Sequence, residues 1–428
     1  MYPGGGIIGC TTAYYLTRHP RFDPSLHTIT LVEAARIANG ASGKAGGLLA
    51  SWAYPSNLAG LSFDLHDRLA KEHNGAELWG YRRVRCGQLI AVGNQPIDNR
   101  QLESTSHSNI ELGKWWSRDR RNASVLPDDL DWFNDESAQA YEEFADTSST
   151  AQVHPLQFTN SIAKLAEQGG ATIIIGKVEH INCGDADGMS ENTSPLTSFE
   201  DLTQKKVVSV TYVDKTTSEK HTLPTTTVVL AAGPWTPTLL PKVRMSPLRA
   251  HSVTIKLKRP VSAYCLFTNI TLNDPSQPST YPDLSKPPSA KTISPEIYTR
   301  PNNEVYICSQ GDCDVPLPPP TDVVAVSSQS CQEIIDAAAS VSDELRNGQV
   351  TGRRACYLPT VDVGVSSGPL VGLTELEGLL LATGHSCWGI LNAPATGKVI
   401  SELIFDGEVS CAEVANLDPR ISHKGAVA

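Results

Sequence analysis

The amino-terminal part of the chain carries GGGIIG at residues 4–9, and this stretch runs directly into CTTAYYL at residues 10–16. A Gly-x-Gly-x-x-Gly pattern before a helix is typical of a tight turn whose backbone can approach a pyrophosphate, because the helix N-terminus offers unpaired N–H groups and a partial positive charge. Glycine is also common in ordinary turns, so the pattern alone does not establish a dinucleotide site. It predicts such a site if the rest of a β-α-β unit follows.

The segment TITLVE at residues 28–33 supplies the second half of this unit. Its apolar residues predict a buried strand after a helix that ends near His19, and Glu33 closes the strand roughly twenty residues beyond the glycines. A carboxylate at this position can accept hydrogen bonds from both ribose hydroxyls of an adenosine and would repel a 2′-phosphate. A chance acid at a strand end is the alternative, but the two features together favour a Rossmann-type dinucleotide site.

The strand that should precede the glycines is short. Only Met1, Tyr2 and Pro3 stand before them, whereas a Rossmann unit uses about five apolar residues there. Pro3 cannot donate a hydrogen bond to a neighbouring strand. Either the strand is truncated or the start codon is misassigned, and in both cases we expect a less stable cofactor site of unchanged identity.

Length and composition set limits on the class of protein. The chain has 428 residues, of which 40% are hydrophobic, and this is enough for two domains or for one domain with a large insertion. Lys and Arg number 35 against 46 Asp and Glu, and the net charge of −11 argues against nucleic acid as a partner. The ten cysteines show no Cys-x-x-Cys pair and no histidine spacing of a zinc site, so we expect no metal.

The sequence shows no targeting or membrane signal. It has no basic segment followed by an apolar stretch at its start and no run of about twenty apolar residues anywhere. It ends in Ala-Val-Ala, which is no peroxisomal tripeptide. We therefore expect an intracellular, cytoplasmic protein without a membrane span.

Several further segments have the periodicity or composition of a particular element. Residues 39–50 form a glycine-rich, apolar loop of the kind that binds a ligand through its backbone. We expect helices at 56–80 as one long helix, 110–122, 155–168, 331–345 and 395–405. We expect strands or hairpins at 86–92, 171–175, 227–236, 249–255, 297–308, 369–372 and 378–385, with a polar insertion at 183–205.

Together these segments carry a resemblance to a known family. It rests on GGGIIG with Glu33, on residues 40–50, 230–235 and 298–306, and most specifically on ATGHSCWGILNAPATGK at 382–398. A glycine-rich strand end followed by Pro-Ala-Thr-Gly-Lys at a helix start is difficult to obtain by chance. The chain resembles the FAD-dependent oxidoreductases of the D-amino acid oxidase type, and within them the fungal Tda3-like oxidoreductases, over nearly its whole length.

The resemblance implies a fold and a domain division. The fold is α/β, with a doubly wound, discontinuous Rossmann-type FAD-binding domain and a second α+β substrate domain that has a mixed or antiparallel sheet. We expect the FAD-binding domain to comprise residues 1–83, 151–245 and 346–428. The substrate domain then comprises residues 84–150 and 246–345.

The resemblance also implies which residues hold FAD. The positive N-terminus of the last helix would face the N1/C2 edge of the flavin ring, where the reduced ring is anionic, and would raise its reduction potential. His385 either polarises the ring or caps the strand. The residues implied in cofactor binding are Gly4, Gly6, Ile7, Ile8, Gly9, Glu33, Ala41, Ser42, Gly43, Gly47, Leu48, Val178, Ala232, Gly233, Trp235, Cys356, Gly384, His385, Ser386, Trp388, Gly389 and Ile390.

Cys356 raises the question of a covalent flavin. In the sarcosine oxidase and fructosyl amine oxidase branch of the family, a cysteine in a Cys-x-Tyr context bonds covalently to the flavin. Here Cys356 and Tyr357 are adjacent, which departs from that context. We therefore expect non-covalent FAD, with a thioether through Cys356 as the alternative.

The family chemistry implied is oxidation of a C–N bond in an amine, amino acid or imino acid. A hydride passes from the carbon beside the nitrogen to flavin N5, and O2 is the expected acceptor that reoxidises the flavin. A guanidinium is a natural bidentate partner for a substrate carboxylate, although Arg300, before a proline in a hairpin, is equally suited to a surface ion pair. The catalytic candidates are Arg249, His251, Tyr298, Arg300 and His385.

Two other functions are considered. One is a flavin-binding protein with a trafficking or regulatory role and little turnover, which the Tda3-like resemblance permits. The other is an NAD-linked dehydrogenase, which is disfavoured because the C-terminal flavin segment has no function there. The expected partners are a small-molecule substrate and O2, and the sequence does not indicate an oligomeric state.

Overall fold

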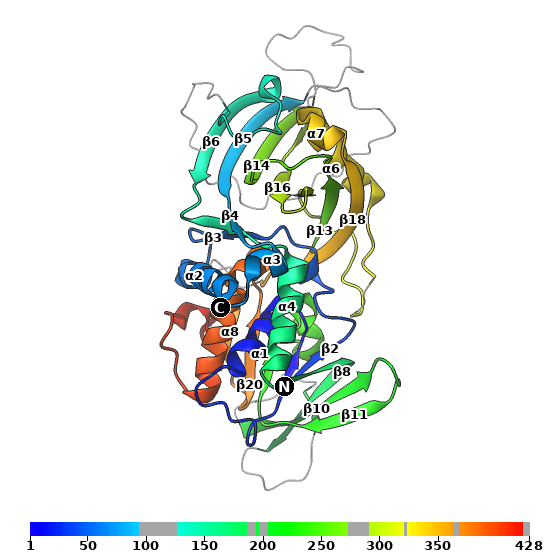
Figure 1. Cartoon of the computed structure of the whole chain (residues 1–428). Coiled ribbons are helices and arrows are strands. Elements are labelled where there is room, and N and C mark those ends of the chain that lie inside the picture. Colours follow the sequence, from blue (N-terminus) through cyan, green and yellow to red (C-terminus); the bar gives the residue numbers. More distant parts are fainter. Residues whose placement is uncertain are drawn as a thin grey trace.

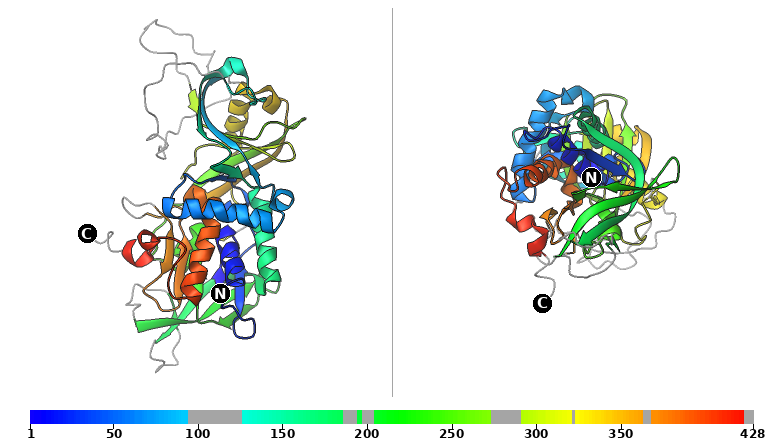
Figure 2. Two further views of the ribbon diagram at one scale, coloured as in Figure 1. Left: turned by 60° about the vertical axis from the view of Figure 1, so that its left-hand side comes forward. Right: turned by 90° about the horizontal axis from the view of Figure 1, so that it is seen from below.

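The computed structural model describes residues 1–93, 126–185, 194–196, 204–272, 291–320, 323–362 and 368–422. The molecule is elongated and consists of two lobes (Figure 1). In the lower lobe helices pack beside a set of strands, and the upper lobe is built around a strongly curved sheet (Figures 1 and 2). The α/β fold with a Rossmann-type domain and a second domain, expected from the sequence, is confirmed.

The lower lobe contains a sheet with a parallel centre. Strand β1 (Tyr2–Pro3) pairs in parallel with β2 (Ile29–Glu33), and β2 pairs in parallel with β8 (Ala171–Asp185). The sheet continues as an antiparallel ribbon through β10 (Lys205–Asp214) and β11 (Lys220–Pro224), and β9 (Ser194–Pro195) pairs with β8. A second set of strands, β12 (Val228–Leu230), β20 (Leu379–Thr383) and β19 (Leu370–Leu373), follows on the other side of β1.

The short first strand is hydrogen-bonded on both sides. The N–H of Gly4 donates to the carbonyl of Val32 over 2.9 Å on one side. On the other side the N–H groups of Val229 and Ala231 donate to the carbonyls of Met1 and Pro3 over 3.0 and 3.1 Å. Pro3 therefore takes part in the sheet as an acceptor, for which its missing N–H is no handicap. Residues 1–3 thus hold the glycine run between β2 and β12.

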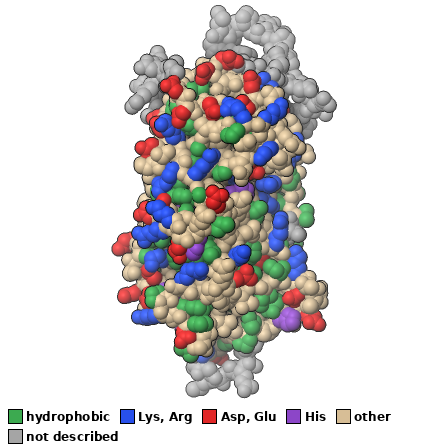
Figure 3. Space-filling model, viewed as in Figure 1, with side chains coloured by type: hydrophobic (Ala, Val, Ile, Leu, Met, Phe, Trp, Pro, Cys, Tyr) green, Lys and Arg blue, Asp and Glu red, His purple; other side chains and the backbone are tan. Residues whose placement is uncertain are grey.

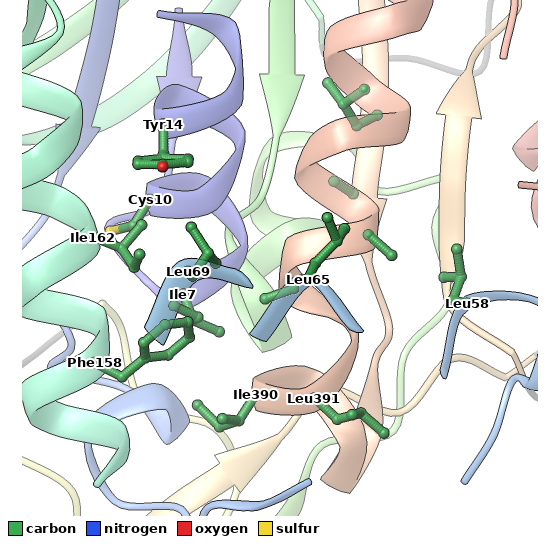
Figure 4. Packing of buried hydrophobic residues seen from close by; sticks show 14 of the residues in the cluster. Ile7, Cys10, Tyr14, Leu58, Leu65, Leu69, Phe158, Ile162, Ile390 and Leu391 are labelled. Carbon is green, nitrogen blue, oxygen red and sulfur yellow. The ribbon is translucent and has the colours of Figure 1, made fainter. Parts of the chain in front are cut away.

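Four helices pack into one core in the lower lobe. They are α1 (Ile7–Leu16), α2 (Ser56–Glu72), α4 (Pro155–Gln168) and α8 (Gly389–Phe405). Figure 4 shows Ile7 of α1, Phe158 of α4, Leu65 of α2 and Ile390 of α8 close to one another in this core. Segments almost four hundred residues apart in the chain are thereby fixed side by side.

Three expected helices differ from the observed ones. The segment 56–80 is divided into α2 and α3 (Gly75–Trp79), because Asn74 adopts a left-handed conformation with φ 54° that ends the first helix. The segment 331–345 is divided into α6 (Ser328–Val341) and α7 (Asp343–Arg346), because extended Ser342 caps the second helix through the N–H of Leu345. The last helix begins at Gly389 and not near residue 395.

The upper lobe is an eight-stranded sheet. Its order is β18 (Gln349–Leu358), β13 (Leu248–Lys256), β17 (Glu304–Cys308), β16 (Glu296–Arg300), β14 (Tyr264–Leu272), β5 (Arg85–Gly93) and β6 (Ala138–Ala145), with β15 (Lys291–Ile293) paired to β14. The pairing is antiparallel except between β14 and β5. Helices α6 and α7 share a buried core with this sheet, and η3 (Asp135–Ser137) precedes β6.

The boundary between the lobes follows the sheets. The expected division places residues 349–358 in the FAD-binding domain, but β18 pairs with β13 in the upper sheet. A three-stranded sheet of β3 (Leu48–Ala50), β7 (Thr150–Gln152) and β4 (Arg82–Arg83) lies where the chain passes between the lobes. We propose that the substrate domain includes β18 and that the FAD-binding domain resumes after it.

Some expectations concern residues that the structure does not describe. The helix expected at 110–122 lies outside the described residues, as does most of the insertion expected at 183–205. Within the described ranges, no helix combines the length and the apolar character needed to cross a membrane. Acidic and basic side chains are interspersed over the face of the molecule that Figure 3 shows. The described part of the chain ends with η7 (Ala415–Leu417) and α9 (Pro419–Ser422).

Candidate active site

A long cavity in the lower lobe is lined by both ends of the chain. It holds about 1240 Å³ of space between protein atoms, including its open mouth. One part of its wall comes from residues 3–8 and 32–45, and another comes from residues 382–390. The remaining wall is supplied by β8, by the segment after β12 and by the end of β18.

The glycines of the first turn serve two different purposes. Gly4 has φ +122°, and a Cβ there would lie 2.3 Å from the carbonyl oxygen of Ala231. A Cβ on Gly9 would lie 2.0 Å from the carbonyl oxygen of Gly4. These two glycines allow the turn to close. Around Gly6, by contrast, only Ser42 Oγ lies near, at 3.1 Å, so the backbone there is open to the cavity.

The N-terminus of α1 is directed to the cavity. Gly6 is its N-cap and offers no side chain, and the N–H of Ile7 donates to Ser42 Oγ over 2.9 Å. Ser42 belongs to η1 (Ala41–Gly43), a single turn in the glycine-rich loop. The N-terminus of this ten-residue helix therefore presents backbone N–H groups and a hydroxyl together, which suits an anionic phosphate.

Glu33 lies at the end of β2 on the cavity wall. Its carboxylate accepts hydrogen bonds from the N–H groups of Gly5 and Ala35, over 2.6 and 2.9 Å. Burial raises the pKa of this carboxyl, while the backbone donors act in the opposite direction. The side chain is thus fixed in place beside the first glycine turn, in the position that the sequence predicts for a ribose acceptor.

A second open glycine lies after β12. Gly233 begins η5 (Gly233–Trp235), which continues into α5 (Thr236–Leu239). It has φ +54°, and no atom lies within 4 Å of a Cβ built there. Trp235 is held by a hydrogen bond from its Nε1 to the carbonyl of Pro318 over 2.7 Å. The backbone at Gly233 can therefore approach a ligand closely.

The wall from the C-terminal segment comprises the end of β20, η6 (Ser386–Trp388) and the first turn of α8. Gly384 allows the turn with φ +81°. His385 is buried, its Nε2 lies 2.9 Å from Thr396 Oγ1, and burial lowers its pKa to about 3. His385 is therefore neutral at physiological pH and is fixed by α8.

The Pro-Ala-Thr-Gly stretch has a structural explanation inside α8. Pro394 has no N–H for the carbonyl of Ile390, and His66 Nε2 of α2 lies 3.0 Å from that carbonyl instead. Ser62 Oγ accepts from the N–H of Ala395 over 3.1 Å and donates to the carbonyl of Leu391 over 2.5 Å. A Cβ on Gly397 would lie 2.7 Å from Thr11, so the glycine allows α1 and α8 to touch. The stretch lies within the helix and not at its start.

Most of the predicted cofactor residues line the cavity. Those that line it are Gly4, Gly6, Ile7, Ile8, Glu33, Ala41, Ser42, Val178, Ala232, Gly233, Trp235, Gly384, His385, Ser386, Gly389 and Ile390. Those that do not are Gly9, Gly43, Gly47, Leu48, Cys356 and Trp388. Gly43 and Gly47 shape the loop, since a Cβ on either would lie 2.1 Å from a carbonyl oxygen.

Sequence reasoning missed several residues of the wall. They include Asn39, Lys177, Thr238, Leu358, Pro359 and Cys387. Cys387 lies inside the quoted C-terminal segment, so its place was available from the motif. Leu358 and Pro359 had no such signal, because they come from the end of a strand in the other lobe.

Arg249 and His251 lie outside the cavity wall and are bound to Asp312. Arg249 Nε and Nη2 lie 3.0 and 2.9 Å from Asp312 Oδ1, and Nη1 donates to the carbonyl of Ala325. His251 Nδ1 lies 3.5 Å from Asp312 Oδ2, and its Nε2 accepts from the N–H of Ser327 over 3.0 Å. Both side chains are buried. Their interactions hold Asp312, Ala325 and Ser327 against β13.

Arg300 and Tyr298 pack against the glycine-rich loop. Arg300 Nη2 donates to the carbonyls of Ala45 and Gly46 over 2.6 and 2.8 Å, and Nη1 binds Glu304 at 3.0 Å. Its guanidinium lies 4.6 Å from the centre of the Tyr306 ring. Tyr298 covers Gly46, where a Cβ would lie 2.3 Å from the ring. Arg300 is buried, so the expected alternative of a surface pair is not what the structure shows.

Cys356 is buried on β18 and does not belong to the cavity wall. Burial raises the pKa of its thiol to about 11, while the nearby Lys44 acts to lower it. Lys44 Nζ donates to the carbonyl of the neighbouring Ala355 over 2.9 Å. Cys356 is therefore a neutral thiol behind the wall.

A row of aromatic rings begins beside the part of the cavity wall that the C-terminal segment supplies. Tyr54 Oη lies 3.6 Å from Sγ of Cys387, which is part of the wall. Consecutive ring centres lie 6.0–6.4 Å apart along the row. The rings, in order, are Tyr54, Trp388, Trp52, Phe144, Phe267, Tyr298 and Tyr306. We call them the aromatic row; sequence reasoning singled out only Tyr298 and Trp388.

Comparisons with known proteins place these features in a family context. A family model described as FAD-dependent oxidoreductase, DAO, matches residues 4–403. TDA3 of Saccharomyces cerevisiae, a protein named as an oxidoreductase, is 34% identical, with 98% of this chain and 93% of the relative covered. A Schizosaccharomyces pombe protein, also named as an oxidoreductase, is 32% identical, with 97% of this chain and 96% of the relative covered.

Solved structures share the fold at low identity. Glycine oxidase from Bacillus cereus matches with a TM-score of 0.62 at 17% identity, covering 96% of this chain and 97% of that one. Iminodiacetate oxidase from Chelativorans matches with a TM-score of 0.64 at 14% identity, covering 98% of each chain. L-proline dehydrogenase from P. horikoshii matches with 0.64 at 14%, covering 99% of this chain and 97% of that one.

Proposed function

The chain belongs to the DAO family of FAD-dependent oxidoreductases, and from this premise we propose that it oxidises a C–N bond of a small amine, amino acid or imino acid. The observation that carries the proposal is the cavity whose wall joins the first glycine turn to the start of α8. The names of the structural neighbours, which refer to glycine, iminodiacetate and proline, support a substrate with a C–N bond next to a C–H bond.

The residues of the cavity fit FAD. A Cβ at Gly233 would project into open space, and a Cβ at Gly6 would meet only Ser42 Oγ, at 3.1 Å, so the backbone at both positions suits close approach of a cofactor. We propose that the N-terminus of α1 with Ser42 holds the pyrophosphate and that Glu33 accepts the ribose hydroxyls. The flavin ring would then lie at the other end, beside Ser386, Gly389 and Ile390.

The chemistry that FAD supplies when bound is acceptance of a hydride from the carbon beside the nitrogen, with O2 as the proposed second acceptor. The protein's part is mainly positioning and electrostatics. The first turn of α8, a helix of 17 residues, lines the cavity with Gly389 and Ile390, and its positive end stabilises negative charge there. Neutral His385 adds a dipole without a charge.

We propose that FAD is held without a covalent bond. Cys356 lies behind the wall, and burial keeps its thiol neutral, whereas the attacking species in thioether formation is the thiolate. The second candidate function, a flavin-binding protein with little turnover, has no observation in its favour.

A panel assay tests the proposed function. The purified flavoprotein is mixed in air with D- and L-amino acids, N-methyl amino acids, cyclic imino acids and simple amines, and release of H2O2 is recorded together with bleaching of the flavin without air. Oxidation of any C–N compound supports the proposal. Bound flavin that stays oxidised with the whole panel would contradict it and would favour the binding role.

A further inference from the structure

The aromatic row is drawn from both lobes and reaches the surface. Trp52, Tyr54 and Phe144 are 44%, 49% and 41% exposed, whereas Tyr298 and Tyr306 at the inner end are each 5% exposed. Trp52, Tyr54 and Trp388 belong to the lower lobe, and the other four rings belong to the upper sheet. Large apolar side chains at a solvent boundary beside a cavity indicate a binding surface.

Most neighbouring rings in the row are arranged edge to face. The planes of Trp52 and Trp388 meet at 80°, those of Tyr54 and Trp388 at 78°, and those of Phe267 and Tyr298 at 77°. In such pairs one ring presents its edge to the face of the next. Ring faces in varied orientations can surround an alkylated cation, which is attracted by the negative potential of each face.

Glu296 is the acidic group beside the row. Its Oε2 accepts hydrogen bonds from the hydroxyl of Tyr298 and from the thiol of Cys308, the latter over 3.7 Å. Oε1 accepts no hydrogen bond from the part of the chain that the structure describes. Burial raises the pKa of this carboxyl.

Glu296 has no cationic partner within the described ranges. No Lys, Arg or His of those ranges lies within ion-pair distance of its carboxylate. Glu296 is half-buried, and a partly desolvated carboxylate without a counter-charge is less favourable than one with a cation bound beside it. A ligand is therefore the natural source of the missing positive charge.

Arg249 and Arg300, the two arginines considered as partners for a substrate carboxylate, are engaged elsewhere. Arg249 binds Asp312 as described above, and Arg300 binds Glu304 and the carbonyls of the glycine-rich loop. Lys44 donates to the carbonyl of Ala355. Beside Tyr298 the row therefore faces the carboxylate of Glu296, whose charge has the wrong sign for a substrate carboxylate. At the inner end, the ring of Tyr306 already has the Arg300 guanidinium 4.6 Å from its centre.

We propose that the substrate is a cationic, N-alkylated amine that needs no carboxylate, with its ammonium group beside Glu296 and its alkyl groups on the aromatic row. This proposal rests on the proposed function, because it takes the nitrogen of the oxidised bond to be the ammonium. The ammonium proton passes to Oε1 of Glu296, which leaves the amine with a lone pair. Loss of the neighbouring C–H as a hydride to bound FAD then gives an iminium ion, which water hydrolyses.

Binding of three matched probes tests the charge preference without turnover. The probes are choline, its uncharged carbon isostere 3,3-dimethylbutanol, and the acid 3,3-dimethylbutanoate. Each is titrated into the full-length flavoprotein, and tryptophan fluorescence and the flavin absorption spectrum are recorded. We expect choline to bind at least about tenfold more tightly than the alcohol, and the acid to bind least. Tighter binding of the acid would overturn the proposal.

Two variants separate charge from packing. Glu296→Gln should weaken choline binding at least about tenfold and leave the affinity for 3,3-dimethylbutanol unchanged. The matched control is Glu333→Gln, which removes a carboxylate of α6 that pairs with Lys291, and it should change neither affinity. Trp52→Leu, at a site that is 44% exposed and so tolerant of change, should weaken choline binding, whereas Phe405→Leu in the lower lobe should not. Unchanged choline binding in Glu296→Gln and Trp52→Leu would refute the proposal.

The same preparation distinguishes this inference from the proposed function. If N-methyl and N,N-dimethyl amines bleach the flavin and amino acids do not, both stand. If only compounds with a carboxylate bleach it, the proposed function stands and this inference fails. If choline binds as expected but no C–N compound bleaches the flavin, the oxidation proposal fails and the binding site remains.

Discussion

Gly6 and Gly4 are two residues apart, but they have different surroundings. A Cβ on Gly4 would meet the backbone of Ala231, whereas a Cβ on Gly6 would meet only the hydroxyl of Ser42 and the open cavity. The spacing of the glycines and the distance to Glu33 were predictable from the sequence because they lie within one local unit. Glu296 was not predictable, because nothing in its own segment distinguishes it from an ordinary exposed acid of a strand.

The two glycines predict opposite effects of substitution. Gly6→Val should weaken FAD binding at least about tenfold, which corresponds to about 1.4 kcal/mol, and should lower the stability of the flavin-free protein less than Gly4→Ala does, because a Cβ at Gly6 meets only Ser42 Oγ. Gly4→Ala should lower the free energy of unfolding by about 2 kcal/mol or more, because the left-handed φ and the contact with Ala231 both resist a side chain. Chemical denaturation and FAD titration measure the two effects. A Gly6→Val protein that binds FAD normally would contradict the assignment of the turn.

Cys356 predicts the fate of the flavin on denaturation. Because the thiol is buried behind the wall, acid precipitation should leave a colourless pellet and release the yellow flavin to the supernatant. Cys356→Ser should bind the same amount of FAD. A yellow pellet from the unmodified protein that turns colourless in Cys356→Ser would show a covalent link.

Helix α8 is the element on which the cavity depends most. It contributes Gly389 and Ile390 to the wall, and it is held by α1 through Gly397 and by α2 through Ser62 and His66. The sequence identified the segment but placed the helix start near Pro394, because proline is common in the first turn of a helix. The carbonyl that Pro394 leaves free is satisfied by a side chain more than three hundred residues earlier in the chain, and no local pattern contains that information.

His66, which contacts α8, makes the free energy of unfolding depend on pH. Burial lowers the pKa of His66 from 6.5 to about 4, so the unfolded chain takes up a proton as the pH falls through about 6.5 and the folded chain does not until about 4. The free energy of unfolding is therefore highest above about pH 6.5, and it falls by about 3 kcal/mol between pH 6.5 and 4 from this group. Buried His385, whose pKa is lowered to about 3, adds a loss of the same sign.

Substitution of His66 measures how much this residue contributes to the pH dependence of the free energy of unfolding. His66→Gln keeps a donor for the carbonyl of Ile390 and removes the titration, so denaturation curves between pH 4 and 6.5 should show a flatter decline than in the unmodified protein. His221→Gln, at an exposed strand position, serves as the matched control and should keep the original slope. A slope unchanged by His66→Gln would refute the role assigned to this histidine.

The whole molecule joins two lobes around one site. The fold class was predictable because the two ends of the chain each carry a recognisable half of a cofactor site, and their meeting in one cavity agrees with that prediction. The place of β18 in the upper sheet was not predictable, because the sequence of a strand near a domain boundary shows no preference for either domain. The aromatic row was also not predictable from the sequence, because its seven rings come from six separate segments of the chain.

Removal of FAD should destabilise the whole lower lobe. A ligand that binds only the folded protein raises the free energy of unfolding by about 2.7 kcal/mol when its free concentration is one hundred times Kd. The Tm of the flavin-free protein should therefore be lower and should rise again as FAD is added back. Gly6→Val should keep the low Tm at the same FAD concentration. An identical Tm with and without FAD would mean that the cavity is not the site where FAD binds.

We propose that the chain holds FAD in this cavity and oxidises a C–N bond with it. The most direct measurement is the absorption spectrum of the purified protein before and after anaerobic addition of an N-methylated amine, followed by readmission of air. The account predicts the spectrum of oxidised flavin at the start, its loss on addition of the amine, and its return with O2. A protein that binds FAD but keeps the oxidised spectrum with amines, amino acids and imino acids alike would contradict it.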